Sequence, residues 1–172
     1  TKCAFEVLQK DSHFFPKRIG ILGHSMGGRI TFLSSNLPSK CLVTLNGAVN
    51  VSEPSGMKMS GDVLKDMDEK GYSIIHTSDG RSELLFPKFV EDCQIYSQEI
   101  YKYKNPILVC VGADDPTLDP NVSYNFVKNC HMDNVDMIVI DKANHTFNAK
   151  TGDYTKVYEL LEKLIPWLKE NI

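Results

Sequence analysis

The chain has 172 residues, of which 42% are hydrophobic and 24% charged, and its formal net charge is −3. This length and apolar content suit one domain with a buried core. Because the sequence has no basic block and its longest apolar runs have only the length of a strand, we expect neither nucleic acid as the main partner nor stable anchoring in a membrane.

Short apolar runs, typical of buried strands, alternate along the chain with segments whose apolar residues repeat at helical spacing. The order is helix, strand, helix, strand, a polar insertion, then strand, helix, strand and helix. These core elements cover residues 2–10, Arg18–Gly23, Met26–Ser35, Cys41–Asn46, Pro106–Val111, a helix through Val122, Phe126 and Cys130, Val135–Ile140, and a last helix with Val157, Leu160, Leu161, Leu164, Ile165 and Leu168 as its apolar stripe. The alternation predicts the α/β class, with a mostly parallel sheet and helices on both of its faces.

The insertion between the second and third predicted strands has patterns of its own. It is predicted to contain a helix over Gly61–Lys70 with Ser60 as N-cap, a hairpin over Tyr72–Leu85 around the turn Asp79-Gly80, and a helix through Phe89, Cys93 and Tyr96. We therefore divide the chain into a partial core, residues 1–49 and 106–172, and a cap or lid, residues 50–105. The apolar residues that either line a pocket or pack this cap on the core are Met57, Met59, Tyr72, Ile74, Leu84 and Phe86.

A glycine-rich motif joins the first predicted strand to the helix that follows it: Gly23-His24-Ser25-Met26-Gly27-Gly28. A serine on a sharp strand-to-helix turn has a strained backbone and an exposed hydroxyl, the arrangement of a nucleophile elbow. Side chains at Gly23 and Gly27 are expected to collide with the turn, so both positions require glycine. The N–H of Met26, at the start of the helix, is expected to stabilise an oxyanion.

The alternative interpretation of this motif is a phosphate-binding turn. A phosphate loop of the Walker type ends in Lys-Ser or Lys-Thr, whereas Gly28 is followed here by Arg29-Ile30. The nucleophile interpretation is therefore favoured.

The serine requires a base, and the base requires an acid that orients it. Of the five histidines, only His145 follows a predicted core strand, so it is the candidate base. His13 lies before the nucleophile strand, His76 belongs to the hairpin, and His131 precedes the last strand. His24 is next to Ser25, where the turn is expected to direct its side chain elsewhere.

The candidate acid lies in the loop after the third core strand, Gly112-Ala113-Asp114-Asp115. Adjacent side chains point in different directions, so only one of the two aspartates is expected to face the base. The spacing after the strand favours Asp115 over Asp114. Asp119 and Asp141 are weaker alternatives. The chain order of serine, acid and histidine is that of the α/β-hydrolases.

Three segments resemble the α/β-hydrolase superfamily, and within it the serine-aminopeptidase-like group with feruloyl and cinnamoyl esterases, monoacylglycerol lipases and thioesterases. They are Gly-His-Ser-Met-Gly-Gly (23–28), Gly-Ala-Asp-Asp (112–115) and Ala-Asn-His-Thr-Phe (143–147). The resemblance implies a hydrolase without cofactor or metal, with Ser25, Asp115 and His145 as its triad. It also implies that N-terminal strands and a second oxyanion donor are missing from this chain. A preceding segment or a second copy is expected to complete the sheet, unless the chain is a miniature hydrolase.

The expected function is hydrolysis of a small carboxylic ester or thioester through an acyl-enzyme on Ser25. An amidase or aminopeptidase of the same fold and a non-catalytic binding module are the alternatives. The five cysteines have no disulfide or zinc-site spacing, and Cys41 and Cys110 lie within predicted strands as small apolar residues. A reducing, cytoplasmic location is therefore expected.

Overall fold

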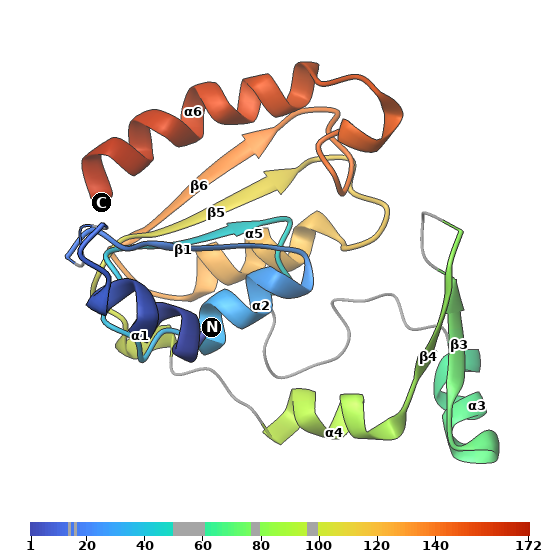
Figure 1. The fold of residues 1–172 in the computed structure, drawn as a ribbon. Helices are drawn as coiled ribbons and strands as arrows, with labels where there is room; N and C mark the ends of the chain where they lie inside the picture. The colour runs from blue at the N-terminus through green and yellow to red at the C-terminus, as the bar shows by residue number, and fades with distance from the viewer. Residues whose placement is uncertain (14, 16, 50–60, 77–79, 96–99) are drawn as a thin grey trace.

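The computed structural model describes residues 1–13, 15, 17–49, 61–76, 80–95 and 100–172 (Figure 1). Its larger sheet has four parallel strands in the order β1-β2-β5-β6. These strands are β1 (Ile21–His24), β2 (Leu42–Leu45), β5 (Ile107–Gly112) and β6 (Val135–Ile140). All six residues of β5 are buried, as expected for a central parallel strand covered on both faces.

Helices lie on both faces of this sheet, which confirms the predicted α/β class. Figure 1 shows α6 above the strands and α2 and α5 below them. The core helices are α1 (Lys2–Lys10), α2 (Met26–Leu33), α5 (Pro120–Asn129) and α6 (Thr155–Asn171), and the short 3-10 turns are η2 (Ile100–Lys102) and η3 (Ala149–Thr151). Because the strands of the sheet are parallel, their carboxyl ends meet at one edge, and the loops that follow β1, β5 and β6 lie there.

The side chains of the central strands divide the core into two apolar layers. Val43 and Leu108 belong to the layer under α6, together with Leu160 and Leu164 of that helix. The neighbouring strand residues belong to the other layer, which contains Phe32 of α2 and is covered by side chains of α5. This division follows from the period of two in a strand, in which successive side chains point to opposite faces.

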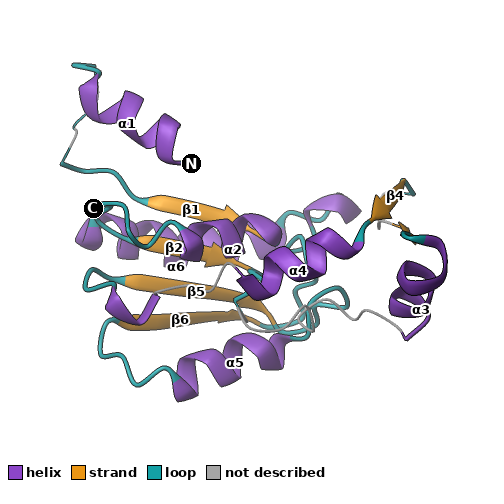
Figure 2. Cartoon of the chain, turned by 90° about the horizontal axis from the view of Figure 1, so that it is seen from below, coloured by secondary structure: helices purple, strands orange, loops and turns teal. Residues whose placement is uncertain are grey.

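The insertion contains α3 (Gly61–Lys70), the antiparallel pair β3 (Ser73–His76) and β4 (Ser82–Leu85), and α4 (Pro87–Ile95). Figures 1 and 2 show these elements to one side of the larger sheet. The hairpin and both helices of the insertion are confirmed. The predicted N-cap Ser60, the turn residue Asp79, and Met57, Met59 and Tyr96 lie outside the described residues.

Four of the apolar cap residues lie on the hairpin or beside it and are partly exposed. Tyr72, Ile74, Leu84 and Phe86 have exposed fractions of 37%, 49%, 56% and 51%. None of these four side chains is buried, so the structure does not show them packing the cap on the core, and this interpretation stays a prediction. Their contribution to a substrate pocket, and the role of residues 50–105 as a lid, stay predictions.

The first strand of the larger sheet starts later in the chain than the sequence predicted. It begins at Ile21 and not at Arg18, and the exposed side chain of Arg18 donates to the main-chain oxygen of Ile172 over 3.2 Å.

Within the part of the chain that the structure describes, no helix has the length and apolar character needed to cross a membrane.

Candidate active site

Ser25 occupies the turn between β1, which ends at His24, and α2, which begins at Met26. Its backbone has φ 55° and ψ −123°, a conformation that is costly for a residue with a side chain. Three main-chain hydrogen bonds hold it there. The N–H of Ser25 donates to Leu45, and its oxygen accepts from Gly28 and Ala48 at 2.9 and 3.2 Å. The strained turn of a nucleophile elbow is therefore present at the predicted serine.

The glycines of the elbow differ in what surrounds them. A Cβ placed on Gly23 would lie 2.0 Å from the main-chain oxygen of Gly27, so no side chain fits there. A Cβ on Gly27 would meet no described atom within 4 Å, and the expectation that Gly27 must be glycine is wrong. A Cβ on Gly28, by contrast, would lie 2.5 Å from the Cα of Gly47. Gly28 thus permits α2 to pack closely against the loop after β2.

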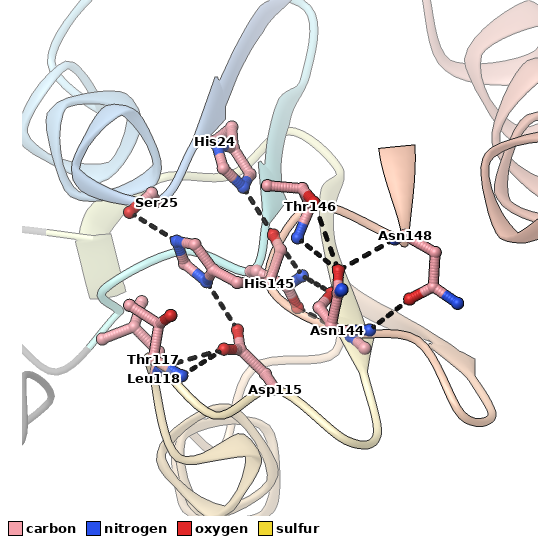
Figure 3. A network of polar contacts seen from close by, with 11 residues as sticks. His24, Ser25, Asp115, Thr117, Leu118, Asn144, His145, Thr146 and Asn148 are labelled. Carbon is pink, nitrogen blue, oxygen red and sulfur yellow. Dashed lines mark hydrogen bonds and ion pairs between the residues drawn. The ribbon is translucent and has the colours of Figure 1, made fainter. Parts of the chain in front are cut away.

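The structure brings together the three residues proposed as a triad (Figure 3). The Nε2 of His145 lies 2.9 Å from the Oγ of Ser25, and its Nδ1 lies 2.7 Å from the Oδ2 of Asp115. Because a carboxylate only accepts, Nδ1–H donates to Asp115, and Nε2 of the neutral ring is left to accept from the serine hydroxyl. The three side chains form one continuous hydrogen-bonded chain.

Asp115 is buried and held by the loop that it begins. Its other oxygen, Oδ1, accepts from the N–H groups of Thr117 and Leu118 at 2.8 and 3.0 Å, which leaves Oδ2 directed at His145 (Figure 3). Asp114 is exposed, in line with the expectation that neighbouring side chains diverge.

The two weaker acid candidates lie elsewhere. Asp119 caps α5 through the N–H of Asn121, and Asp141 is exposed in the turn after β6. Of the four candidate acids, Asp115 is therefore the one that the structure places against His145.

The loop that carries His145 is fixed by its own side chains. The Oδ1 of Asn144 accepts from the N–H groups of Thr146 and Asn148, and the Oδ1 of Asn148 accepts from the N–H of Asn144 (Figure 3). Asn148 has a left-handed backbone with φ 64°, a conformation that asparagine tolerates better than most residues. The imidazole is only 15% exposed, so its orientation is restrained on most sides.

Two contacts to the backbone of His145 were not predicted from the sequence. His24 does not point elsewhere: its Nε2 lies 2.7 Å from the main-chain oxygen of His145, and the two rings are 4.8 Å apart. Asn46, which is buried after β2, donates to the same oxygen over 3.0 Å. The sequence contained one signal for Asn46, namely that it is a polar residue at the carboxyl end of a predicted buried strand. Ser25, Asp115 and His145 lie at the same edge of the sheet.

His13 and His76 have partners of their own outside this chain of hydrogen bonds. His13 pairs with Asp11 in an exposed turn, and His76 contacts Ser82 within the hairpin at 3.0 Å. Among the described residues, no group of three or more His, Cys, Asp or Glu side chains is arranged to hold a metal ion.

Comparison with known proteins gives the following matches. The model of the prolyl oligopeptidase family matches residues 1–172. Est1E from Butyrivibrio proteoclasticus, solved with ferulic acid, has a TM-score of 0.71 at 20% identity over 99% of this chain. A monoacylglycerol lipase from Paleococcus ferrophilus has a TM-score of 0.66 at 14% identity over 99% of this chain and 73% of its own. A puromycin-hydrolyzing peptidase from Mycobacterium tuberculosis has a TM-score of 0.66 at 19% identity over 99% of this chain and 24% of its own.

These structural likenesses show a shared fold. The chain spans 65% of the length of Est1E, which is less than two thirds. No curated protein matches the chain.

Proposed function

This chain belongs to the prolyl oligopeptidase family of α/β-hydrolases, and from that premise we propose that it is a serine hydrolase acting on carboxylic esters or thioesters. The observation that carries the proposal is the continuous set of hydrogen bonds from Ser25 through His145 to Asp115, at 2.9 and 2.7 Å. The strained backbone of Ser25 supports it, because strain of this kind persists where the surrounding structure enforces it, and it presents the hydroxyl beside the base.

The proposed reaction begins with attack of the Ser25 Oγ on the carbonyl carbon while the Nε2 of His145 takes the hydroxyl proton. Asp115 accepts the Nδ1–H of His145 and stabilises the imidazolium that forms. The imidazolium then gives its proton to the departing alcohol or thiol, which leaves an acyl group on Ser25. A water molecule, deprotonated by His145, attacks that acyl group and releases the acid.

The oxyanion that forms during attack requires hydrogen-bond donors. Met26 is the first residue of α2, where helical N–H groups have no partner within the helix. We propose its N–H as one donor, with the positive end of the helix beside it. Removing one such donor in other serine hydrolases costs about 2.7–4 kcal/mol of transition-state stabilisation, so the supply of a second donor governs how fast this chain turns over.

Peptide or amide hydrolysis is the second candidate, and the family match favours it. The same three side chains serve both reactions, because an amine differs from an alcohol mainly as a leaving group that must be protonated by His145. Est1E and the puromycin-hydrolyzing peptidase have TM-scores of 0.71 and 0.66 to this chain, so similarity of fold does not separate an ester substrate from a peptide, and the choice between them is left to the assay below.

The first test is covalent labelling with a fluorophosphonate probe. We expect the chain to be labelled and Ser25→Ala to lose all labelling, because only the serine beside His145 is activated. Ser82→Ala is the matched control: Ser82 also contacts a histidine, His76, at 3.0 Å, but it is not on an elbow and should not be labelled. Labelling that persists in Ser25→Ala would refute the proposed nucleophile.

The second test compares substrates on protein that has not been treated with the probe. Short-chain p-nitrophenyl esters, an acyl thioester, and an aminoacyl or prolyl p-nitroanilide are assayed by kcat/KM. The ester proposal predicts turnover of the esters and little turnover of the anilides, whereas comparable anilide hydrolysis identifies a peptidase. Absence of both labelling and turnover would leave the binding module, the remaining alternative.

A further inference from the structure

Asn46 lies at the carboxyl end of β2, between the strand that leads to Ser25 and the strand that leads to Asp115. Only 3% of it is exposed, and its backbone has φ 43°. Its main-chain N–H donates to the oxygen of Cys110 in β5 over 2.8 Å. A buried polar side chain in this position must find partners within the protein, because an unpaired amide is costly.

The amide of Asn46 has partners on two different segments. Its Oδ1 accepts from the N–H of Gly112, the last residue of β5, over 2.6 Å. Its Nδ2 donates to the main-chain oxygens of Asn144 and His145 over 3.2 and 3.0 Å. One planar group thus ties the strand that ends three residues before Asp115 to the loop that carries the base.

Only a neutral amide provides this combination in one short side chain. The contact to Gly112 requires an acceptor, and the contacts to the two carbonyls require a donor with two N–H bonds. A carboxylate of the same size would keep the first contact but would place its negative charge against both carbonyl oxygens. We propose that Asn46 is a positioning residue for the reaction proposed above, which keeps Asp115 and His145 aligned with Ser25. The inference rests on that proposed function.

Asn46→Asp is the informative variant, because aspartate has the same size and also tolerates a left-handed backbone. Asn134→Asp is its matched control. The Nδ2 of Asn134 donates to the main-chain oxygens of Tyr103 and Asn105 over 3.2 and 2.6 Å. The two asparagines make the same kind of contact, but Asn134 immediately precedes β6 and so lies at the amino end of the sheet, away from the proposed triad.

We expect Asn46→Asp to lower kcat for a p-nitrophenyl ester by about 100-fold with KM within about twofold, since small displacements of reacting groups have effects of that size. Asn134→Asp should keep kcat, and because Asn134 is only partly buried it should lose less stability in urea than Asn46→Asp. A far-downfield proton resonance from the Nδ1–H of His145 provides a second readout, which should shift or disappear in Asn46→Asp and remain in Asn134→Asp.

Failure of this inference can be distinguished from failure of the proposed function. If the unaltered chain is labelled at Ser25 and Asn46→Asp matches Asn134→Asp in kcat and in the proton resonance, Asn46 does not position the triad. If the unaltered chain is neither labelled nor active, both proposals fall. Should Asn46→Asp not fold, Asn46→Gly removes the amide while permitting the left-handed backbone, and the same loss of kcat is expected of it.

Discussion

Ser25 has a backbone conformation that is costly in free energy. The two glycines on either side of it differ in whether a side chain would fit at their positions. Gly23 has the oxygen of Gly27 where a Cβ would lie, at 2.0 Å, whereas Gly27 faces no described atom within 4 Å. The motif therefore requires glycine at its first position for steric reasons, but not at its fifth. Helical geometry accounts for the difference, because Gly27 is already in α2 and its Cβ would point away from the turn.

Alanine at these two positions separates the two cases. Gly23→Ala should destabilise the protein by about 1–3 kcal/mol or more, because the added methyl overlaps the backbone of the elbow. Gly27→Ala should leave stability unchanged or raise it by about 0.5–1 kcal/mol, since alanine is the better residue within a helix. Urea unfolding of both variants measures the difference. Equal destabilisation by the two substitutions would contradict the structure.

The sequence predicted the residues of the candidate site whose positions follow from strand order. Ser25, Asp115 and His145 each follow a core strand of a parallel sheet, and the carboxyl ends of such strands meet at one edge. The contacts of Asn46 and His24 could not be predicted in this way. They join residues about 100 positions apart through side-chain directions that spacing alone does not define.

At the scale of elements, α6 shows what periodicity predicts and what it leaves open. The apolar stripe of this helix was predicted as one continuous face, yet Leu160 and Leu164 are 4% exposed while Leu161 and Ile165 are 37% and 44% exposed. The buried residues pack on the sheet, and the exposed ones line a shallow hollow with Tyr158. The spacing of apolar residues predicts how wide the apolar stripe of the helix is. How many of those residues are buried depends on the width of the sheet on which the helix packs.

Adjacent residues of α6 provide a test of this division. Leu164→Ala should lower the free energy of unfolding by about 2–5 kcal/mol, because it leaves a cavity in the layer between α6 and the sheet. Ile165→Ala should change it by about 0.5 kcal/mol or less, as an exposed substitution does. Denaturant unfolding of the two variants checks both values. A loss at Ile165 as large as that at Leu164 would mean that the hollow is filled in solution.

The architecture of the whole molecule could be predicted because strands and helices alternate along the chain. The order of strands and helices fixed the α/β class, and the strands of the larger sheet follow one another in chain order. Residues 50–105 were harder to interpret, because hairpin and helix signals identify the elements of an insertion but not what they cover. The half-exposed apolar residues of the hairpin show this, since burial on the core was one of the two expectations for them.

The sheet interior also determines how the protein responds to alkaline pH. Cys41 and Cys110 were predicted as small apolar residues, and both are fully buried. Burial raises the pKa of Cys41 to about 11 and that of Cys110 to about 12, from a usual value of 9.0. It also raises the pKa of Tyr103. In each case the folded protein retains a proton that the unfolded chain gives up more readily.

The free energy of unfolding should therefore be constant with respect to these thiols below about pH 9 and should fall as the pH rises toward 11 and 12. Above pH 9 the unfolded chain binds fewer protons than the folded one, so each thiol contributes a slope of up to about 1.4 kcal/mol per pH unit. Urea unfolding between pH 7.5 and 10.5 measures this slope. Cys110→Ala should reduce it, although this variant is less stable at every pH. Cys3→Ala, at an exposed position, should leave it unchanged. If the slope is the same with and without the Cys110 thiol, the thiol ionises as readily in the folded protein as in the unfolded chain, and the interior around β5 is open to water.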